Sequence, residues 1–156
     1  MTEKEILYKQ MNDQFKVLIS DETDWLAKLS NASSLLYHTL PQLNWSGFYL
    51  YKENMLVLGP FQGKPACVRI PLNKGVCGTA AFEKKTIVVN DVHEFPGHIA
   101  CDSVSLSEIV VPVITDGELF GVLDLDSPVL ARFDETDRKG LEAFIQIFVN
   151  QYAATK

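Results

Sequence analysis

The chain has no excess of basic residues and no long hydrophobic run. Its 14 lysine and arginine residues are outnumbered by 20 aspartate and glutamate residues, so the formal net charge is −6. Because nucleic-acid-binding proteins usually carry a basic face, we expect no nucleic-acid partner. No stretch of about 18 apolar residues is present, so no membrane-spanning helix is predicted. Residues 1–5 lack the basic region of a secretion signal, so we expect a cytoplasmic protein.

Cysteine is scarce, because the chain contains only Cys67, Cys77 and Cys101. In the reducing cytoplasm, an odd number of cysteines favours free thiols, metal ligands or a transient catalytic disulfide over a permanent disulfide framework. The cysteines are separated by 10 and 24 residues, whereas structural zinc sites usually contain closely spaced Cys-x2-Cys pairs. We therefore expect no metal and no cofactor. The three thiols are the main indication of function, and they suggest redox chemistry.

Internal repeats, low-complexity segments and linkers are also absent from the sequence. The composition of 47% hydrophobic and 22% charged residues is typical of a soluble globular protein. A chain of 156 residues is long enough to bury one continuous core, so we predict a single domain spanning residues 1–156.

The spacing of apolar residues predicts the order of helices and strands. Helical spacing occurs at 3–20, in a segment capped by Asp21 or Thr23 that runs to about residue 40, and at 76–83 and 134–153. Strands are predicted at 45–51, 55–61, 68–70, 86–89, 108–114 and 119–125. This order predicts an α+β fold, in which the N- and C-terminal helices pack together on one face of an antiparallel sheet.

The local sequence predicts a different reactivity for each thiol. Cys77 lies near the start of the predicted helix 76–83, where the helix dipole favours a thiolate, so local electrostatics favour Cys77 as a nucleophile. Cys77 is equally consistent with a small buried hydrophobic residue. Cys101 follows a loop with His93 and His98, and such a loop can expose a sulfur and move it. We assign no role to these histidines, because neither has a visible acidic partner.

Two aspartates are predicted to lie on one face of the strand 119–125. Side chains alternate along a strand, so Asp124 and Asp126 point the same way. Like charges held close together raise the pKa of one carboxyl group, which then keeps a proton for general-acid catalysis. In the alternative interpretation, the strand ends after Leu123 and both aspartates are solvated.

Aromatic residues alternate in the same way along the strand 45–51. Trp45, Gly47 and Tyr49 share one face, and Gly47 leaves space between two rings that enclose a small ligand. Aromatic residues at this spacing are also typical of ordinary packing. The pattern alone leaves both interpretations open.

Seven motifs combine these residues across nearly the whole chain. They are Asn-Trp-Ser-Gly-Phe-Tyr at 44–49, Leu-Gly-Pro-Phe-Gln-Gly at 58–63, Ala-Cys at 66–67, Gly-Val-Cys-Gly-Thr-Ala at 75–80, His-Ile-Ala-Cys-Asp at 98–102, Ser-Glu-Ile-Val-Val-Pro at 107–112 and Gly-Val-Leu-Asp-Leu-Asp-Ser at 121–127. Together they resemble the GAF-domain free methionine-(R)-sulfoxide reductases. The three cysteine positions make this resemblance far more specific than a GAF fold alone.

The resemblance implies an enzyme that reduces free L-methionine (R)-sulfoxide and is regenerated by thioredoxin. It implies that Cys101 attacks the sulfoxide, that Cys67 resolves the resulting sulfenic acid as a disulfide, and that Cys77 is secondary. It therefore reverses the ranking that local electrostatics favour. Active-site loops are expected on the sheet face opposite the helices. GAF domains of this type often pair, so we expect a homodimer with the first helix in its contact.

The same resemblance assigns roles to the acidic and aromatic residues. The sulfoxide oxygen must be protonated as it leaves, and Glu108, Asp124 and Asp126 match the acidic cluster of the family, with Glu108 as the expected acid. The remaining acidic charge binds the substrate ammonium, while Trp45 and Tyr49 enclose the S-methyl group.

Two other functions are consistent with the sequence. One is a stand-alone GAF sensor that binds a small molecule without turnover, because a GAF fold by itself says little about function. The other is a thiol redox switch with no substrate. Sensors usually come fused to an output domain and we expect none in these 156 residues, so the enzyme is the leading interpretation.

Overall fold

The computed structural model describes residues 1–99 and 103–155. These residues form one antiparallel sheet with helices on both sides. The elements are α1 (Glu3–Leu18), α2 (Trp25–Thr39), β1 (Trp45–Lys52), β2 (Met55–Gly63), β3 (Arg69–Pro71), α3 (Gly75–Glu83), β4 (Ile87–Val89), the 3-10 helix η1 (Val92–Glu94), β5 (Ser107–Thr115), β6 (Glu118–Ser127) and α4 (Glu135–Thr155). The strand order is β3-β2-β1-β6-β5-β4.

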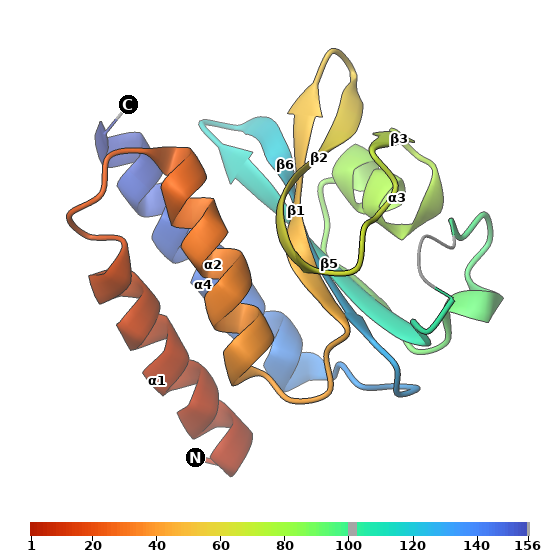
Figure 1. Ribbon diagram of the computed structural model, residues 1–156, viewed down its shortest axis with the longest axis horizontal. Coiled ribbons are helices and arrows are strands. Elements are labelled where there is room, and N and C mark those ends of the chain that lie inside the picture. The colour runs from red at the N-terminus through yellow and green to blue at the C-terminus, as the bar shows by residue number, and fades with distance from the viewer. Residues whose placement is uncertain (100–102, 156) are drawn as a thin grey trace.

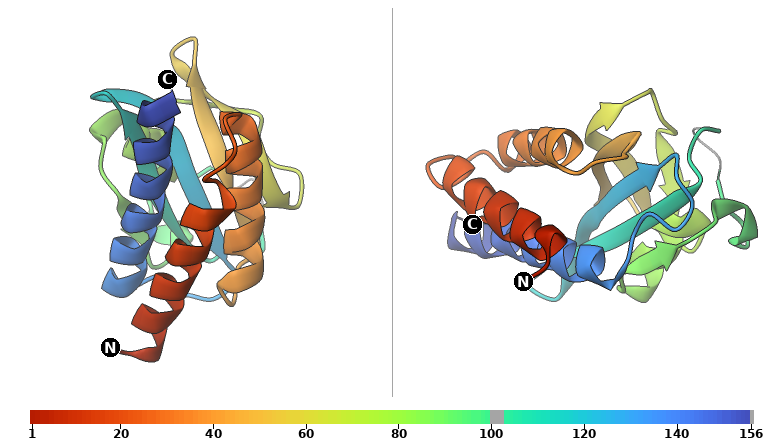
Figure 2. Two further views of the ribbon diagram at one scale, coloured as in Figure 1. Left: turned by 90° about the vertical axis from the view of Figure 1, so that its left-hand side faces the viewer. Right: turned by 90° about the horizontal axis from the view of Figure 1, so that it is seen from below.

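The helices and the loops cover opposite faces of this sheet. In Figures 1 and 2, α1, α2 and α4 lie on one side, and α3 and η1 lie on the other. Helices α2 and α4 contact the sheet directly, while α1 packs mainly against α4. The predicted α+β architecture, with the terminal helices on one face, is therefore confirmed. That one domain spans residues 1–156 stays a prediction.

Alternation along the central strands separates two cores. Phe48 of β1 and Leu123 and Leu125 of β6 are buried beneath the helices. There the rings of Phe15 and Phe144 stack with centroids 3.9 Å apart, which joins α1 to α4. The alternate residues of the same strands point to the other face, so period-two patterning assigns one face to the helical core and leaves the other for a site.

Helix α2 begins later than its predicted caps allow. Asp24 is the N-cap, rather than Asp21 or Thr23, and its Oδ1 accepts a hydrogen bond from the Leu26 backbone N–H at 2.8 Å. The backbone at Asp24 is extended, as capping by a short acidic side chain requires. Helix α2 therefore starts at Trp25, later than predicted.

A buried carboxylate near the start of α4 ties the helical layer together. Asp137 accepts hydrogen bonds from Tyr8 Oη at 2.7 Å, from Lys4 Nζ at 2.8 Å and from an Arg132 guanidinium nitrogen at 3.2 Å. Breaking one partner of a buried ion pair typically costs about 3–5 kcal/mol. This network fixes α1 against α4 and holds the segment that leads from β6 into α4.

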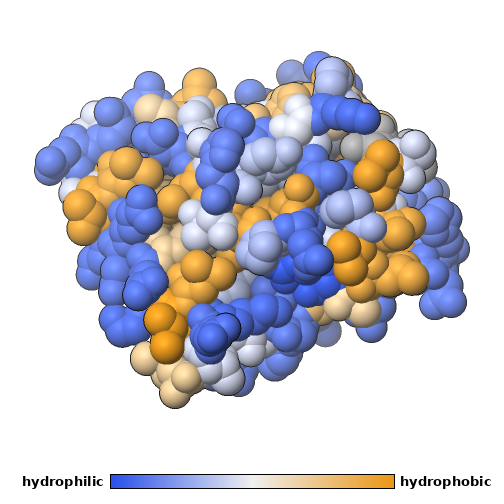
Figure 3. All heavy atoms as spheres, turned by 60° about the horizontal axis from the view of Figure 1, so that its bottom comes forward, coloured by the Kyte–Doolittle hydropathy of each residue, from blue (hydrophilic) through white to orange (hydrophobic). Residues whose placement is uncertain are grey.

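Some large hydrophobic side chains remain on the surface. On α1, Ile6, Val17 and Leu18 are exposed, with Val17 at 75%. The face seen in Figure 3 is a mosaic in which hydrophobic patches alternate with hydrophilic residues. None of the helices within residues 1–99 and 103–155 combines the length and the apolar composition that crossing a membrane requires.

Candidate active site

A cavity on the sheet face opposite α1, α2 and α4 brings together most of the predicted site residues. Its lining includes Trp45, Tyr49, Cys77, Glu108, Asp124 and Asp126, six of the eight residues to which the sequence assigns roles. They come from β1, α3, β5 and β6. The seventh, Cys67, lies in the neighbouring loop between β2 and β3, and the eighth, Cys101, lies outside the described residues.

Strand register explains how the acidic residues meet. Across β1, β6 and β5, Trp45 pairs with Asp126, and Asp126 pairs with Glu108. In the next row on this face, Asp124 has Gly47 on one side and Val110 on the other. Neither neighbour offers a polar side chain, and Asp124 Oδ1 is buried without a hydrogen-bond partner among the described residues. An oxygen of this kind on a cavity wall is suited to a donor group of a ligand.

The alternative of solvated aspartates is wrong, because β6 continues to Ser127 and Asp124 is only 5% exposed. Burial raises the pKa of Asp124 well above its ordinary value, and the charge of Asp126 raises it further. Burial likewise raises the pKa of Glu108, with Asp124 as the second cause. Desolvation penalises the charged form of a carboxyl group, so these groups keep their protons to a higher pH than ordinary carboxyl groups do.

Cys77 is buried at 4% exposure, so the expectation of a reactive thiolate is wrong. Burial raises the pKa of its thiol well above the ordinary value, and the charges of Asp124 and Glu108 raise it further. Its Sγ lies 3.9 Å from Glu108 Oε2. Desolvation and two acidic neighbours therefore outweigh the helix dipole, which contributes at most about 2 kcal/mol. Gly78 lets α3 pack closely against the end of β3, because a Cβ at this position would collide with the Pro71 carbonyl oxygen.

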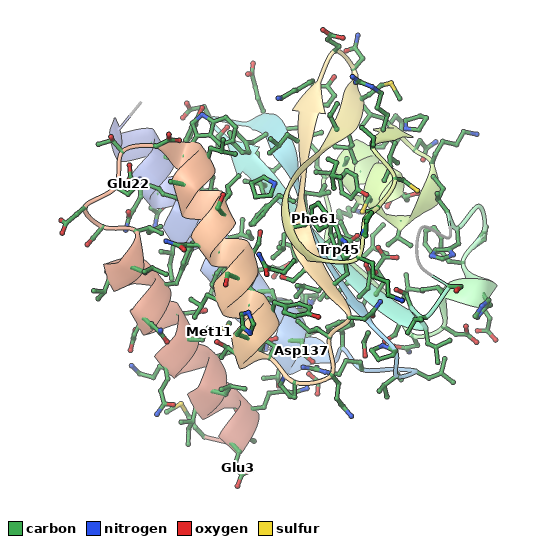
Figure 4. All side chains as sticks on the ribbon, viewed as in Figure 1. Glu3, Met11, Glu22, Trp45, Phe61 and Asp137 are labelled. Carbon is green, nitrogen blue, oxygen red and sulfur yellow. The ribbon has the colours of Figure 1, made fainter. Side chains whose placement is uncertain are left out.

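The aromatic residues form a stacked wall. The rings of Trp45 and Phe61 stack with centroids 5.2 Å apart. The ring of Tyr49, two residues further along β1, stacks on Trp45 with centroids 5.9 Å apart. Figure 4 shows Trp45 and Phe61 beside each other at β1 and β2. Gly47 does not leave a ligand gap as expected, because a Cβ at this position would collide with the Cβ of Phe61. The glycine makes room for the neighbouring strand instead.

Two of these aromatic residues also hold the loop that carries Cys67. Tyr49 Oη donates a hydrogen bond to the Cys67 carbonyl oxygen at 2.8 Å, and Trp45 Nε1 donates one to the Lys64 carbonyl oxygen at 3.1 Å. Burial raises the pKa of Tyr49, which keeps its hydroxyl as a donor. Cys67 is half-buried, whereas Cys77 is a buried free thiol. The cavity wall and the Cys67 loop thus form one hydrogen-bonded unit.

His98, to which the sequence assigns no role, also lines the cavity. Its Nε2 lies 3.8 Å from Glu108 Oε1, and its side chain is 16% exposed. Burial lowers the pKa of His98, so the ring is neutral near neutral pH. Its acidic partner, Glu108, comes from strand β5 and could not be recognised from the sequence next to His98. The only signal in the sequence is that two histidines, His93 and His98, precede Cys101.

Metal binding would need the same acidic groups. Within the described part of the chain, Cys77, Glu108 and Asp124 are close enough to hold an ion, with ligand atoms within 4.8 Å of one another. The raised pKa of each group means that an ion would have to displace its proton. The expectation of no metal stays a prediction.

The buried acid should make the folded protein less stable as pH rises. The pKa of Glu108 is higher in the folded state than in the unfolded state, so unfolding releases a proton above about pH 4.3. Replacing Glu108 by Gln should therefore stabilise the protein near neutral pH, by on the order of 1 kcal/mol or more, and this gain should shrink on acidification. Denaturant unfolding over a pH series measures it, with Glu118→Gln as an exposed control on the adjacent strand. A Glu108→Gln variant no more stable than wild type near neutral pH contradicts the buried-acid account.

The chain is similar to proteins of one family over most of its length. The GAF domain model matches residues 17–155. Protein YtsP of Bacillus subtilis is 56% identical over 146 residues, which cover 92% of this chain and 90% of YtsP. The free methionine-R-sulfoxide reductase of Escherichia coli is 51% identical over 138 residues, covering 88% of this chain and 84% of the relative.

A solved structure has nearly the same fold. The fRMsr of Staphylococcus aureus in complex with substrate superposes with a TM-score of 0.90 at 54% identity, covering 94% of this chain and 95% of that one. The resemblance seen in the sequence motifs is thereby confirmed. This chain belongs to the GAF domain family, in the group that contains the free methionine-R-sulfoxide reductases.

Proposed function

We propose that this protein reduces free L-methionine (R)-sulfoxide to methionine with its cysteine thiols. The observation that carries the proposal is a pair of buried carboxyl groups, Glu108 and Asp124, beside an aromatic wall in one cavity. Sulfoxide reduction needs a proton for the oxygen and an apolar contact for the methyl group, and these residues can supply both. The names of relatives in Escherichia coli and Staphylococcus aureus support the same activity.

In the first step, the Cys101 thiolate bonds to the sulfoxide sulfur, and Glu108 gives its proton to the sulfoxide oxygen. The oxygen then moves to the sulfur of Cys101, the S–O bond of the substrate and the transient bond between the two sulfurs break, and the products are methionine and a Cys101 sulfenic acid. The sulfoxide sulfur is reduced to a thioether and the cysteine sulfur is oxidised. The raised pKa of Glu108 supports its part as the acid, since an ordinary glutamate would have lost its proton near neutral pH.

In the second step, Cys67 attacks the sulfenic acid, water leaves, and a Cys67–Cys101 disulfide forms. Thioredoxin is the proposed reductant, because exchange with an external dithiol returns both cysteines to thiols. Support comes from the loop of Cys67, which borders the cavity and is held by Tyr49. Cys77 is a poor substitute for Cys67, because burial and nearby carboxyls oppose its thiolate.

Recognition of the free amino acid uses its charged ends. Asp126 and Asp124 are proposed to take the substrate ammonium, and the unpartnered Oδ1 of Asp124 is available for an N–H donor. Trp45 and Tyr49 enclose the S-methyl group. Backbone N–H groups of the loop that begins at Asp91 are proposed to bind the substrate carboxylate. Peptide-linked methionine sulfoxide lacks both free ends and should be excluded.

The cytoplasmic location and a homodimer belong to the same proposal. Ile6, Val17 and Leu18 on α1 are exposed apolar residues, which supports α1 as part of a contact between two copies. Pairing through α1 would leave the cavity open, because the cavity is lined in part by α3, and α1 and α3 lie on opposite sides of the sheet (Figure 2).

The activity is tested by oxidation of NADPH in the presence of thioredoxin, thioredoxin reductase and free methionine sulfoxide. We expect turnover with the R epimer and none with the S epimer. Cys101→Ser should form no methionine. Cys67→Ser should form a single methionine per chain and then stop at the sulfenic acid, which dimedone traps.

Binding of the R epimer without NADPH oxidation would contradict the enzyme and favour a sensor. Full turnover by Cys101→Ser would refute its assignment as the nucleophile. Full turnover by Cys67→Ser would refute its assignment as the resolving cysteine.

The hydrogen bond from Tyr49 to the Cys67 loop should matter in the second step. In Tyr49→Phe, the loop loses a hydrogen bond of about 1 kcal/mol, so disulfide formation should slow about fivefold relative to methionine formation. Rapid-quench measurements of methionine and of the dimedone adduct give the two rates. Tyr51→Phe on the same strand is the matched control, because Tyr51 Oη bonds the exposed Asn54 side chain. If the ratio of disulfide formation to methionine formation is the same in Tyr49→Phe and Tyr51→Phe, the hydrogen bond from Tyr49 does not assist the second step.

A further inference from the structure

We propose that His98 returns a proton to Glu108 after each reduction, an inference that rests on the proposed function. Glu108 must regain a proton in every cycle, and its side chain is only 8% exposed. His98 Nε2 lies 3.8 Å from Glu108 Oε1, and the histidine side chain is twice as exposed at 16%. His98 is therefore placed between the buried acid and the outer part of the cavity.

The two oxygens of Glu108 face different partners. Oε2 lies 3.9 Å from the thiol of Cys77, and Oε1 faces His98. The Cys77 thiol is buried and its raised pKa makes it a poor carrier of protons to and from solvent. Imidazole has two nitrogens and can accept a proton on one while it releases a proton from the other. Of the two partners, His98 is thus the one suited to exchange.

The resting pair is neutral on both sides. Burial lowers the pKa of His98, with the nearby His93 as a second cause, and burial raises the pKa of Glu108. The other acidic and basic groups on the cavity wall are Lys74, the N-cap residue of α3, and Asp124 and Asp126 of β6. When Glu108 has given its proton away, the new negative charge beside the ring favours imidazolium. The pair therefore changes charge only during turnover.

The proton reaches Glu108 in two transfers. His98 takes a proton from water or a buffer acid, the Nε2–H bond then breaks, and an O–H bond forms on Glu108 Oε1. A separation of 3.8 Å is longer than a hydrogen bond, so the ring must move slightly or act through one water molecule. The His98 backbone N–H donates a hydrogen bond to the Phe95 carbonyl oxygen at 3.2 Å. The backbone is therefore held in place while the ring moves.

His93 provides a matched control in the same loop. Its side chain is 70% exposed, and its Nδ1 lies 3.2 Å from Asp91 Oδ1 rather than near the acidic cluster. It does not line the cavity. A general effect of losing a histidine from this loop should therefore appear in both His93→Ala and His98→Ala, and an effect on proton return only in the second.

The test compares the first turnover with steady-state turnover at saturating thioredoxin. In His98→Ala, the first methionine should form at nearly the wild-type rate, because Glu108 starts with its proton, while steady-state turnover falls at least about tenfold. Added imidazole should restore turnover in His98→Ala. It should not affect His93→Ala or rescue Glu108→Gln, which has no carboxyl group to reprotonate.

The relay is refuted if wild type and His98→Ala have the same steady-state rate, or if imidazole fails to restore the rate that His98→Ala has lost. If wild type does not reduce the sulfoxide, the proposed function fails instead. The pairing of His98 with Glu108 can still be tested by imidazole nitrogen NMR during a pH titration. Glu108→Gln should shift the His98 signals and leave those of His93 unchanged, and unchanged His98 signals would refute the relay without any activity measurement.

Discussion

The burial of two carboxyl groups side by side is the constraint on which the site depends. Glu108 and Asp124 are 6% and 5% exposed, on adjacent strands that bring them to one cavity wall. Desolvation raises the pKa of both groups, and the charge of Asp124 raises that of Glu108 further, so Glu108 keeps its proton to a higher pH than an ordinary glutamate does. An acid that keeps its proton near neutral pH is the chemical property that sulfoxide reduction requires. The cost is reduced stability, as is common at functional sites.

The rest of the fold can be understood as support for this arrangement. The helical core under Phe48 and Leu123 makes the sheet rigid from one side, so the other face can carry polar groups. The register of β1, β6 and β5 places an aromatic ring and two acids in one row. The hydroxyl of Tyr49 then links this wall to the backbone of Cys67. Strand β1 therefore lies between the acidic residues of β6 and the loop that carries Cys67.

Sequence patterning predicted the sheet and the shared faces, because strand alternation is a local property. It placed Asp124 and Asp126 on one face of their strand, and Trp45 and Tyr49 on one face of theirs. It could not determine the environment of Cys77, since the carboxyls that oppose its ionisation come from residues 31 and 47 positions further along the chain. The sequence likewise could not pair His98 with Glu108, because the two residues lie on different elements that only the fold brings together. Gly47 was misinterpreted because the neighbour that needs its space, Phe61, lies on another strand.

To act as the acid, Glu108 must carry a proton at the pH at which the enzyme works. Infrared difference spectroscopy of the carboxyl C=O stretch, with Glu108→Gln to assign the band, measures this directly. We expect a protonated-carboxyl band in wild type near neutral pH that is absent from the variant. A Glu108 that is ionised near neutral pH, with only the carboxylate bands present, would contradict the account.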